Sequence, residues 1–173
     1  QEPWLFDEKT RDAVRKTVRL RYRFIPYIYD LARECERTGE PIVRPLVYEY
    51  PHDKMVRNIC DEYLLGKFVL VAPVTVPGKF AREVYLPEGE WYDYETNEKY
   101  TGGKYILADA PLDKVPVFIR AGAILPVAEG NIQSTEDITS ENTRILTYPG
   151  QGTFIHYEDD NETLAYREGS YNA

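Results

Sequence analysis

The residues of this sequence that could do acid–base chemistry are two pairs of neighbouring carboxylates, Asp61 with Glu62 and Asp159 with Asp160. A pair that acts as general acid and nucleophile needs its two carboxyl groups about 5–5.5 Å apart on one side of a substrate. Neighbours on a strand point to opposite faces, so neither pair meets this need within one strand, although acids can also meet across strands. We therefore interpret these acids as turn and edge residues, and we predict no catalytic residue in this chain.

The two histidines and two cysteines predict neither a metal site nor a cofactor. Cys35 and Cys60 are far apart and neither belongs to a C-x-x-C pair, which argues against zinc and against a disulfide framework. Free thiols fit a reducing compartment, so we expect a cytoplasmic protein. His156 alternates with apolar neighbours, as an ordinary strand residue does, whereas His52 follows a predicted strand and could line the rim of a barrel.

The aromatic residues could stack on sugar rings, since the chain holds 15 tyrosines and 2 tryptophans. The best candidate is the run from Trp91 to Tyr94. On a strand, Trp91 and Asp93 share one face, and Tyr92 and Tyr94 share the other. We favour the interpretation that one set lies in the core while the other forms a cross-strand pair on the surface.

The net charge of -8 argues against a nucleic acid and against an anionic membrane surface as partners, because both are bound through lysine and arginine. No apolar run approaches the roughly 18 residues of a membrane span. Cations nevertheless crowd one predicted helix: Arg11, Arg15, Lys16, Arg19, Arg21 and Arg23. They could form an anion-binding face, but the overall acidity favours a solvated or salt-bridged face.

The apolar pattern predicts a long helix from Asp7, a suitable N-cap, to about Thr38, with Gly39 as its C-terminal stop. Pro26 lies inside this helix and removes a backbone donor, so we expect a kink or a short break there. Six apolar residues form one stripe of the helix, at spacings of three and four. They are Val14, Val18, Tyr22, Ile25, Tyr29 and Ala32.

A buried strand is predicted at residues 42–50, although Pro45 is unusual in a central strand. From Tyr63 onward, apolar runs recur about every ten residues between turn signals such as Gly102 and Gly103, a pattern typical of an antiparallel sandwich or barrel. The predicted strands are 68–74, 83–86, 90–94, 104–107 and 115–120. The expected fold class is therefore mainly β with a long N-terminal helix, α+β overall.

The last part of the chain predicts an incomplete β domain. Residues 131–142 are polar and indicate a linker or an exposed loop. Residues 144–150 and 153–157 look like two strands joined by a glycine-containing turn, and another turn follows near Asn161. Because two strands cannot form an independent sheet, we expect the opening of a further domain.

Several longer motifs resemble glycoside hydrolase family 31. The motifs similar to the end of its catalytic barrel are LRYRFIPYIY (20–29), GEPIVRPL (39–46), DEYLLG (61–66) and LVAPV (70–74). Those similar to its proximal β-sandwich are VYLPEGEWYD (84–93) and APLDKVPVFIRAGAILP (110–126), and those similar to its distal β-sandwich are YPG (148–150) and YEDD (157–160). The resemblance covers essentially the whole chain in the family's order. One departure is Asn161, where the family more often has glycine; both residues tolerate a left-handed turn.

The resemblance implies a parent enzyme with a (β/α)8 barrel that hydrolyses α-linked glycosides with retention of configuration. It implies a nucleophile and a general acid/base in segments like Trp-x-Asp-Met-Asn-Glu and Gly-Asp-Asn, and neither segment occurs here. Residues 1–62 would be the end of the barrel, 63–130 the proximal β-sandwich, and 131–173 a linker with a truncated start of the distal β-sandwich. We expect the chain to be a structural support region that binds no cofactor and is inactive by itself.

The placement at a barrel end gives two further expectations. Active sites of such barrels lie at the C-terminal ends of the strands, which puts Tyr48, Glu49, His52 and Asp53 nearest the carbohydrate substrate, as shape rather than chemistry. The apolar helix stripe would face a missing barrel sheet, so the helix should fold onto the sandwich, self-associate with a copy, or be poorly ordered. The alternative is a stand-alone carbohydrate-binding β-sandwich module, which explains the strands and aromatics but leaves the long helix unexplained.

Overall fold

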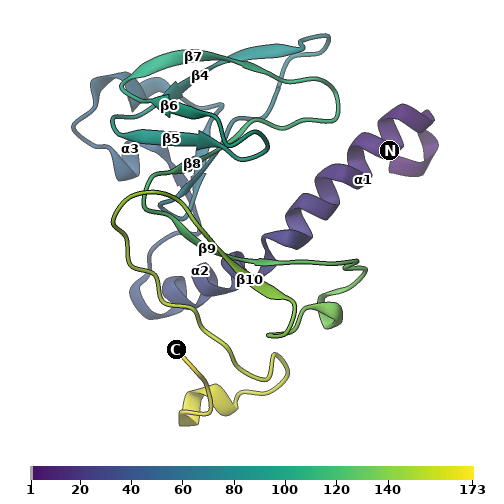
Figure 1. Cartoon of the computed structure of the whole chain (residues 1–173), viewed down its shortest axis with the longest axis vertical. Coiled ribbons are helices and arrows are strands. Elements are labelled where there is room, and N and C mark those ends of the chain that lie inside the picture. Colours follow the sequence, from purple (N-terminus) through teal and green to yellow (C-terminus); the bar gives the residue numbers. More distant parts are fainter. Residues whose placement is uncertain (1) are drawn as a thin grey trace.

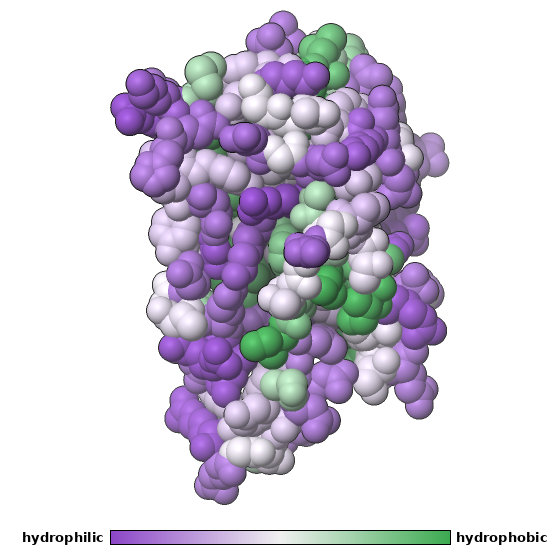
Figure 2. Space-filling view, turned by 60° about the vertical axis from the view of Figure 1, so that its left-hand side comes forward, coloured by the Kyte–Doolittle hydropathy of each residue, from purple (hydrophilic) through white to green (hydrophobic). Residues whose placement is uncertain are grey.

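The computed structural model of the chain describes residues 2–173. Within them, a pair of N-terminal helices is followed by short strands that form three antiparallel sheets (Figure 1). The predicted fold class, mainly β with an N-terminal helical segment, is thus confirmed. On the face that Figure 2 shows, hydrophobic residues form small patches between hydrophilic ones.

The N-terminal helical segment consists of two α-helices, α1 (Glu8–Arg23) and α2 (Ile25–Thr38), after the 3-10 turn η1 (Pro3–Leu5). Asp7 caps α1, since its carboxylate accepts a hydrogen bond from the Thr10 backbone N at 2.9 Å. Pro26 lies in the first turn of α2, where its missing N–H is least harmful, and the helix breaks at Phe24. Gly39 ends α2 with a left-handed φ of 79°. The predicted cap, break and stop are confirmed.

The largest sheet has six strands in the order β1-β2-β3-β8-β5-β6, and every neighbouring pair is antiparallel. The strands are β1 (Val43–Pro45), β2 (Tyr63–Leu65), β3 (Val69–Val71), β8 (Val117–Arg120), β5 (Glu90–Asp93) and β6 (Lys99–Thr101). Two smaller sheets pair β4 (Ala81–Leu86) with β7 (Lys104–Asp109), and β9 (Ile124–Ala128) with β10 (Thr143–Thr147).

The six-stranded sheet is buried on both faces, because alternate residues of its strands belong to two separate cores. On one face Leu70 and Phe118 pack with Val84 of the β4–β7 pair. On the other, Val69 and Ile119 pack against residues of α2 and β9, namely Tyr27, Leu31, Leu125 and Val127. Helix α2 is therefore fastened to the sheet by its own apolar face.

The predicted strand at 42–50 is mostly wrong. Its strand part is only β1, and the chain then turns into the short helix α3 (Leu46–Glu49) and the 3-10 helix η2 (Lys54–Asn58). The reason is Pro45, which has no N–H to continue a ladder and whose φ of -64° suits the start of a helix. Moreover, β1 pairs antiparallel with β2, so it joins the six-stranded sheet.

The C-terminal prediction is half correct. β10 confirms the strand near 144–150, but residues 153–157 form no strand, and His156 is therefore not an ordinary strand residue. A strand needs a neighbour for its backbone groups, and the Tyr157 N–H donates instead to the Asp30 carboxylate at 2.7 Å. The segment continues through one bridge, Glu158 with Asn172, and the 3-10 turn η4 (Ala165–Glu168). Asn161 has the left-handed φ of 56° that its residue type allows.

The sequence patterns did not predict β2, β6 or β9. The loop predicted at 131–142 contains the 3-10 turn η3 (Thr135–Asp137). The three missed strands are 3 to 5 residues long and lack a clear period-2 pattern. Other predicted strands begin or end within a few residues of β3, β4, β5, β7 and β8. Such short strands form because neighbouring strands bond to them.

The helix does fold onto the sheet, but through a different face from the predicted stripe. Phe24, Tyr27 and Leu31 are buried, whereas Val18 is 47% exposed and Tyr29 is 36% exposed. On α1, Leu20 packs toward the sheet. Val18, two residues earlier, is rotated from Leu20 by more than half a turn around the helix axis. The outer stripe of α1, formed by Val14, Val18 and Tyr22, is therefore partly exposed to solvent.

Candidate functional site

The four residues predicted to lie nearest a substrate follow one another along the chain. Tyr48 and Glu49 end α3, His52 lies in the next turn, and Asp53 is the N-cap of η2. Tyr48 and His52 are exposed, and Glu49 and Asp53 are half-buried. The Tyr48 hydroxyl donates to Glu40 Oε2 at 2.9 Å. Two buried networks hold this segment: Arg44 holds its first half, and Tyr85 holds its second.

Arg44 is the centre of the first network, with a side chain that is only 3% exposed. Its Nε donates to the Pro41 carbonyl at 2.7 Å, and its Nη1 pairs closely with Glu49. Its Nη2 lies 3.5 Å from Glu34 Oε2 and 3.5 Å from Glu40 Oε2. Burial tends to lower the pKa of Arg44, but the hydrogen bond to Glu49 and the nearby carboxylates raise it instead. One guanidinium thus ties α2, β1 and α3 together.

Sequence reasoning did not find this role of Arg44. The available signal was a charged residue between Val43 and Pro45, in a run that otherwise predicted burial. A guanidinium in such a run needs several acceptors, since an unpaired buried charge is costly. Glutamates at 34, 40 and 49 supply them, but only the folded chain brings all three together.

Tyr85, on β4, is the centre of the second network. Its hydroxyl donates to Asp53 Oδ2 at 2.7 Å, and its backbone N–H donates to Glu62 Oε1 at 3.0 Å. Asp53 also caps η2 by accepting from the Met55 backbone N at 2.9 Å. The segment after α3 is therefore pinned to the β4–β7 pair, and Asp53 has a structural partner for each of its carboxylate oxygens.

The acid pair Asp61–Glu62 is a structural unit around Arg82. The Glu62 carboxylate is 2% exposed and the Asp61 carboxylate 49% exposed, so the two do not face one solvent-accessible space. Arg82 Nη2 lies 2.9 Å from Asp61 Oδ2 and 3.3 Å from Glu62 Oε1. Burial raises the pKa of Glu62 to about 7, against the opposing effects of the Tyr85 N–H and the Arg82 charge.

The second acid pair also has structural partners. Asp159 accepts hydrogen bonds from the hydroxyls of Tyr29 and Tyr157, at 2.8 Å to Oδ1 and 2.7 Å to Oδ2 respectively. Asp160 accepts from the Thr163 backbone N at 2.9 Å and from its hydroxyl. Asp160 thus holds its own turn, whereas Asp159 joins the C-terminal segment to α2. The interpretation as turn and edge residues fits the exposed Asp61 and Asp160 but not Glu62, which is buried.

The aromatic run on β5 lies inside the molecule. Trp91 is fully buried and its Nε1–H donates to the Pro87 carbonyl at 2.8 Å. Tyr92, on the opposite face of the strand, is also buried and lies 5.6 Å from Tyr148 between ring centroids. Neither ring is available to stack on a sugar, and both faces of β5 belong to the core.

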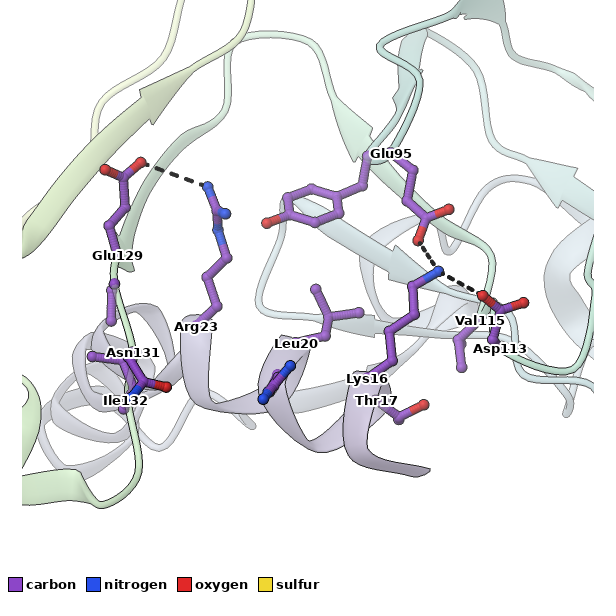
Figure 3. Close-up of a pocket in the computed structure, with 14 residues that line it drawn as sticks. Lys16, Thr17, Leu20, Arg23, Glu95, Asp113, Val115, Glu129, Asn131 and Ile132 are labelled. Atoms are coloured by element: carbon purple, nitrogen blue, oxygen red, sulfur yellow. Dashed lines mark hydrogen bonds and ion pairs between the residues drawn. The ribbon is translucent and has the colours of Figure 1, made fainter. Parts of the chain in front are cut away.

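A cleft of about 660 Å³ lies between α1, the loops that carry Glu95 and Asp113, and the chain from the end of β9 to Ile132, and ion pairs cross it (Figure 3). Lys16 Nζ lies 3.2 Å from Glu95 Oε1 and 3.1 Å from Asp113 Oδ2. Farther along the helix, Arg23 Nη2 lies 3.8 Å from Glu129 Oε1. The hydrogen bond to Asp113 raises the pKa of Lys16. The cationic helix face is thus salt-bridged at these positions, and the cleft's acids bind lysine and arginine.

Comparison with known proteins decides the family. Residues 39–125, half of the chain, match the glycosyl hydrolase family 31 C-terminal domain, and residues 1–31 match the TIM-barrel domain of the same family. The chain belongs to glycosyl hydrolase family 31.

Relatives in family 31 are similar over nearly the whole chain. An α-glucosidase 2 of Bacillus thermoamyloliquefaciens is 39% identical over 99% of the chain and 22% of its own length. An α-xylosidase of Saccharolobus solfataricus is 39% identical over 99% of the chain and 24% of its own length. The chain thus spans about a quarter or less of these relatives.

Solved family 31 structures share the fold. A Flavobacterium johnsoniae dextranase, complexed with isomaltotriose as a mutant, superposes on 98% of the chain and 21% of its own length, with a TM-score of 0.88 and 38% identity. An α-xylosidase from Xanthomonas citri superposes with a TM-score of 0.87 and 36% identity over 94% of the chain and 18% of its own length. The arrangement of helices and sheets in this chain is therefore that of the C-terminal region of family 31 glycosidases.

Two further observations on this family 31 chain concern metal-binding groups and membrane-spanning helices. Among residues 2–173, no group of three or more histidine, cysteine and acidic side chains is placed to hold a metal ion. In the same range, no helix is both long and apolar enough to cross a bilayer. The histidine nearest the predicted substrate side, His52, is exposed.

Proposed function

We propose that this chain is the support region of a retaining α-glycosidase, in which it closes the catalytic barrel and braces its last helix. The observation that carries the proposal is the packing of α2 on the six-stranded sheet. Residues 1–31 match the barrel domain and 39–125 the C-terminal domain, and Tyr27 and Leu31 join the two inside one core. Such a joint transmits stability from the β domain to the barrel.

We place the parts of the chain within this role as follows. Residues 1–62 contribute the end of the barrel, 63–130 the proximal β-sandwich, and 131–173 a linker with the start of the distal β-sandwich. The pairing of β1 with β2 crosses the first boundary, so the proposed barrel end and sandwich share a sheet. The core between the six-stranded sheet and the β4–β7 pair supports a sandwich arrangement.

The substrates that we propose for the whole protein are α-linked glucosides or xylosides. Support comes from relatives named α-glucosidase and α-xylosidase and from a dextranase structure complexed with isomaltotriose. Within this chain, Tyr48, Glu49, His52 and Asp53 shape the substrate side without doing chemistry. The Arg44 and Tyr85 networks, which fix this segment, support that role.

The decisive experiment uses the whole gene product that contains this chain. Leu46, fully buried beside Val56 and Leu64, is changed to aspartate, and the exposed Met55 is changed to aspartate as the matched control. We expect Leu46→Asp to abolish soluble protein and hydrolysis of an aryl α-glucoside or α-xyloside, and Met55→Asp to retain both. Normal yield and activity of Leu46→Asp would contradict the proposed support.

The isolated chain provides the second test. Incubated with an aryl α-glucoside, it should release no more product than buffer does. Saturable binding of malto- or isomalto-oligosaccharides at micromolar to millimolar concentration would favour a carbohydrate-binding module instead. The burial of Trp91 and Tyr92 speaks against that alternative.

The location that we propose is the cytoplasm, and it rests on Cys35 and Cys60 alone, which are both free thiols in the fold. Fractionation of cells that produce the tagged gene product tests it. Recovery outside the cytoplasm would contradict it.

A further inference from the structure

The C-terminal segment, residues 157–173, is joined to the rest of the fold through side chains. Every backbone–backbone hydrogen bond of this segment in the described chain stays within it, as in the mutual bonds of Glu158 and Asn172 at 3.0 and 2.9 Å. The segment adds no strand to the three sheets. It can therefore open without breaking any ladder of the sheets.

The side-chain contacts of the segment lead to helix α2. The Tyr157 backbone N–H donates at 2.7 Å to the Asp30 carboxylate, whose side chain is only 2% exposed. The Tyr29 hydroxyl donates at 2.8 Å to Asp159 Oδ1, and the rings of Tyr29 and Tyr157 lie 5.9 Å apart between centroids. Two neighbouring residues of the helix thus hold the start of the segment.

Arg33, one turn farther along α2, is the centre of these contacts. Its Cζ lies 4.9 Å from the ring centroid of Tyr157 and 5.3 Å from those of both Tyr166 and Tyr171. A guanidinium is attracted to the face of an aromatic ring. Glu36, which pairs with Arg33, also accepts from the Tyr166 hydroxyl at 3.4 Å. One cation therefore gathers rings from both ends of the segment.

The chain before this segment is held in a different way. The Phe154 ring lies 5.6 Å from that of Tyr27 and 6.3 Å from that of Phe68, in the core between α2 and the six-stranded sheet. Gly152 packs so closely on Gly122 that an added Cβ would come within 2.0 Å of the Gly122 carbonyl oxygen. The chain is thus fixed as far as Phe154, and an opening of the segment would begin after this residue.

We propose that Tyr29, Asp30, Arg33 and Glu36 form a docking surface on α2, and that the C-terminal segment leaves this surface as one unit while the sheets stay folded. Arg33 is the anchor of the docked state. The segment moves as a unit because its two ends are bonded to each other and share this cation. The docking is a property of this chain and does not depend on the proposed function.

The test is native-state hydrogen exchange of the 173-residue chain, followed by NMR at low urea concentrations. The amides of Tyr157, Glu158 and Asn172 should share one free energy of opening, lower than that of the Ala72 and Arg120 amides, which are bonded across the six-stranded sheet. Urea should change the opening of the segment less steeply, because this opening exposes less surface than unfolding of the chain does.

Arg33→Met tests the anchor, since methionine keeps a long side chain without the cation. The protection factors of the three segment amides should fall by the same factor, about tenfold, because three ring contacts of the cation are lost. Those of Ala72 and Arg120 should stay unchanged. The matched control is Arg37→Met, one turn later on α2, where no ring within residues 2–173 lies under the guanidinium. It should leave all five protection factors unchanged.

Four results would overturn the proposal. Segment amides with the opening free energy and urea dependence of the sheet amides would show that the segment opens only when the whole chain unfolds. Unprotected segment amides in the wild type would show that it is not docked. A loss of protection in Arg33→Met that is confined to Tyr157 would contradict opening as one unit, and equal protection in Arg33→Met and the wild type would contradict the anchor.

Discussion

Glu62 accepts a hydrogen bond from the backbone N–H of Tyr85 at 3.0 Å through one oxygen, while its other oxygen, Oε2, is buried without a hydrogen-bond partner among the described residues. Burial raises the pKa of this carboxyl group to about 7, well above the ordinary value of 4.5. A proton on Oε2 would remove the charge that the core disfavours. Between about pH 4.5 and 7, a pKa raised in this way means that the folded chain keeps a proton at Glu62 that the unfolded chain releases.

The stability of the chain should depend on pH through Glu62. Between about pH 4.5 and 7 the folded state holds one more proton than the unfolded state, so the free energy of unfolding falls as pH rises through this window. Glu62→Gln removes this dependence and should be more stable than the wild type at pH 8, by about 1–3 kcal/mol. Urea unfolding at pH 5 and pH 8 measures both variants.

The matched control for this prediction is Glu83→Gln, at an exposed position of the adjacent strand β4. It should change stability equally at pH 5 and pH 8. If the difference between Glu62→Gln and the wild type were the same at both pH values, the proton would not be bound at Glu62.

Arg44 should be one of the residues on which folding depends most. Replacing it with methionine keeps much of its volume but leaves the carboxylates of Glu34, Glu40 and Glu49 around an uncharged side chain. We expect a loss of about 2–4 kcal/mol, since removing one partner of a buried ionic network is strongly destabilising. The free energy of unfolding of Arg44→Lys should lie between those of the wild type and Arg44→Met, because lysine keeps the charge but lacks the guanidinium fork.

Urea unfolding of the chain measures the effect of the Arg44 substitutions, with Arg57→Met at an exposed position as the control. The control should lie within about 0.5 kcal/mol of the wild type, as surface substitutions usually do. An equally small change in Arg44→Met would show that the network contributes little.

The two tryptophans should report opposite environments. Trp4 is 68% exposed and Trp91 is fully buried. Trp4→Phe leaves Trp91 as the only indole, so its emission should be blue-shifted and resist quenching by acrylamide. Maltose, isomaltose and xylose should leave the emission of this variant unchanged. A sugar-dependent change would mean that Trp91 takes part in binding.

The outer stripe of α1 should mediate self-association of the isolated chain. Val18 and its neighbours Val14 and Tyr22 lie beside the exposed Trp4 in a groove of about 400 Å³. Val18→Glu should weaken association by about tenfold, since burying one valine is worth about 1.5 kcal/mol or more. Sedimentation velocity over a concentration series measures this.

Leu107→Glu is the control for self-association, because Leu107 is exposed on β7, a strand that contributes no residue to the groove beside Val18. It adds the same charge and should leave association unchanged. A wild-type chain that remains monomeric at all concentrations would contradict the prediction.

The sequence by itself determined the family, the mainly β fold class and the limits of the helices. Asp7, Pro26 and Gly39 act through groups within a few residues of themselves, so their types were sufficient to predict a cap, a break and a stop. Most strands with five or more patterned residues were also found. The signals that predicted them, short apolar runs between turn residues, are local as well.

Only the tertiary structure decided which faces and side chains meet. Residues 42–50 and 153–157 have strand-like composition, but partners elsewhere in the chain determine whether backbone groups enter a ladder. The hydrogen bond from the Tyr85 backbone to Glu62 joins residues 23 positions apart. The contact of Asp30 with His156 joins residues 126 positions apart. Contacts over such separations leave no periodic signal in the sequence, because they arise when separately formed elements pack together.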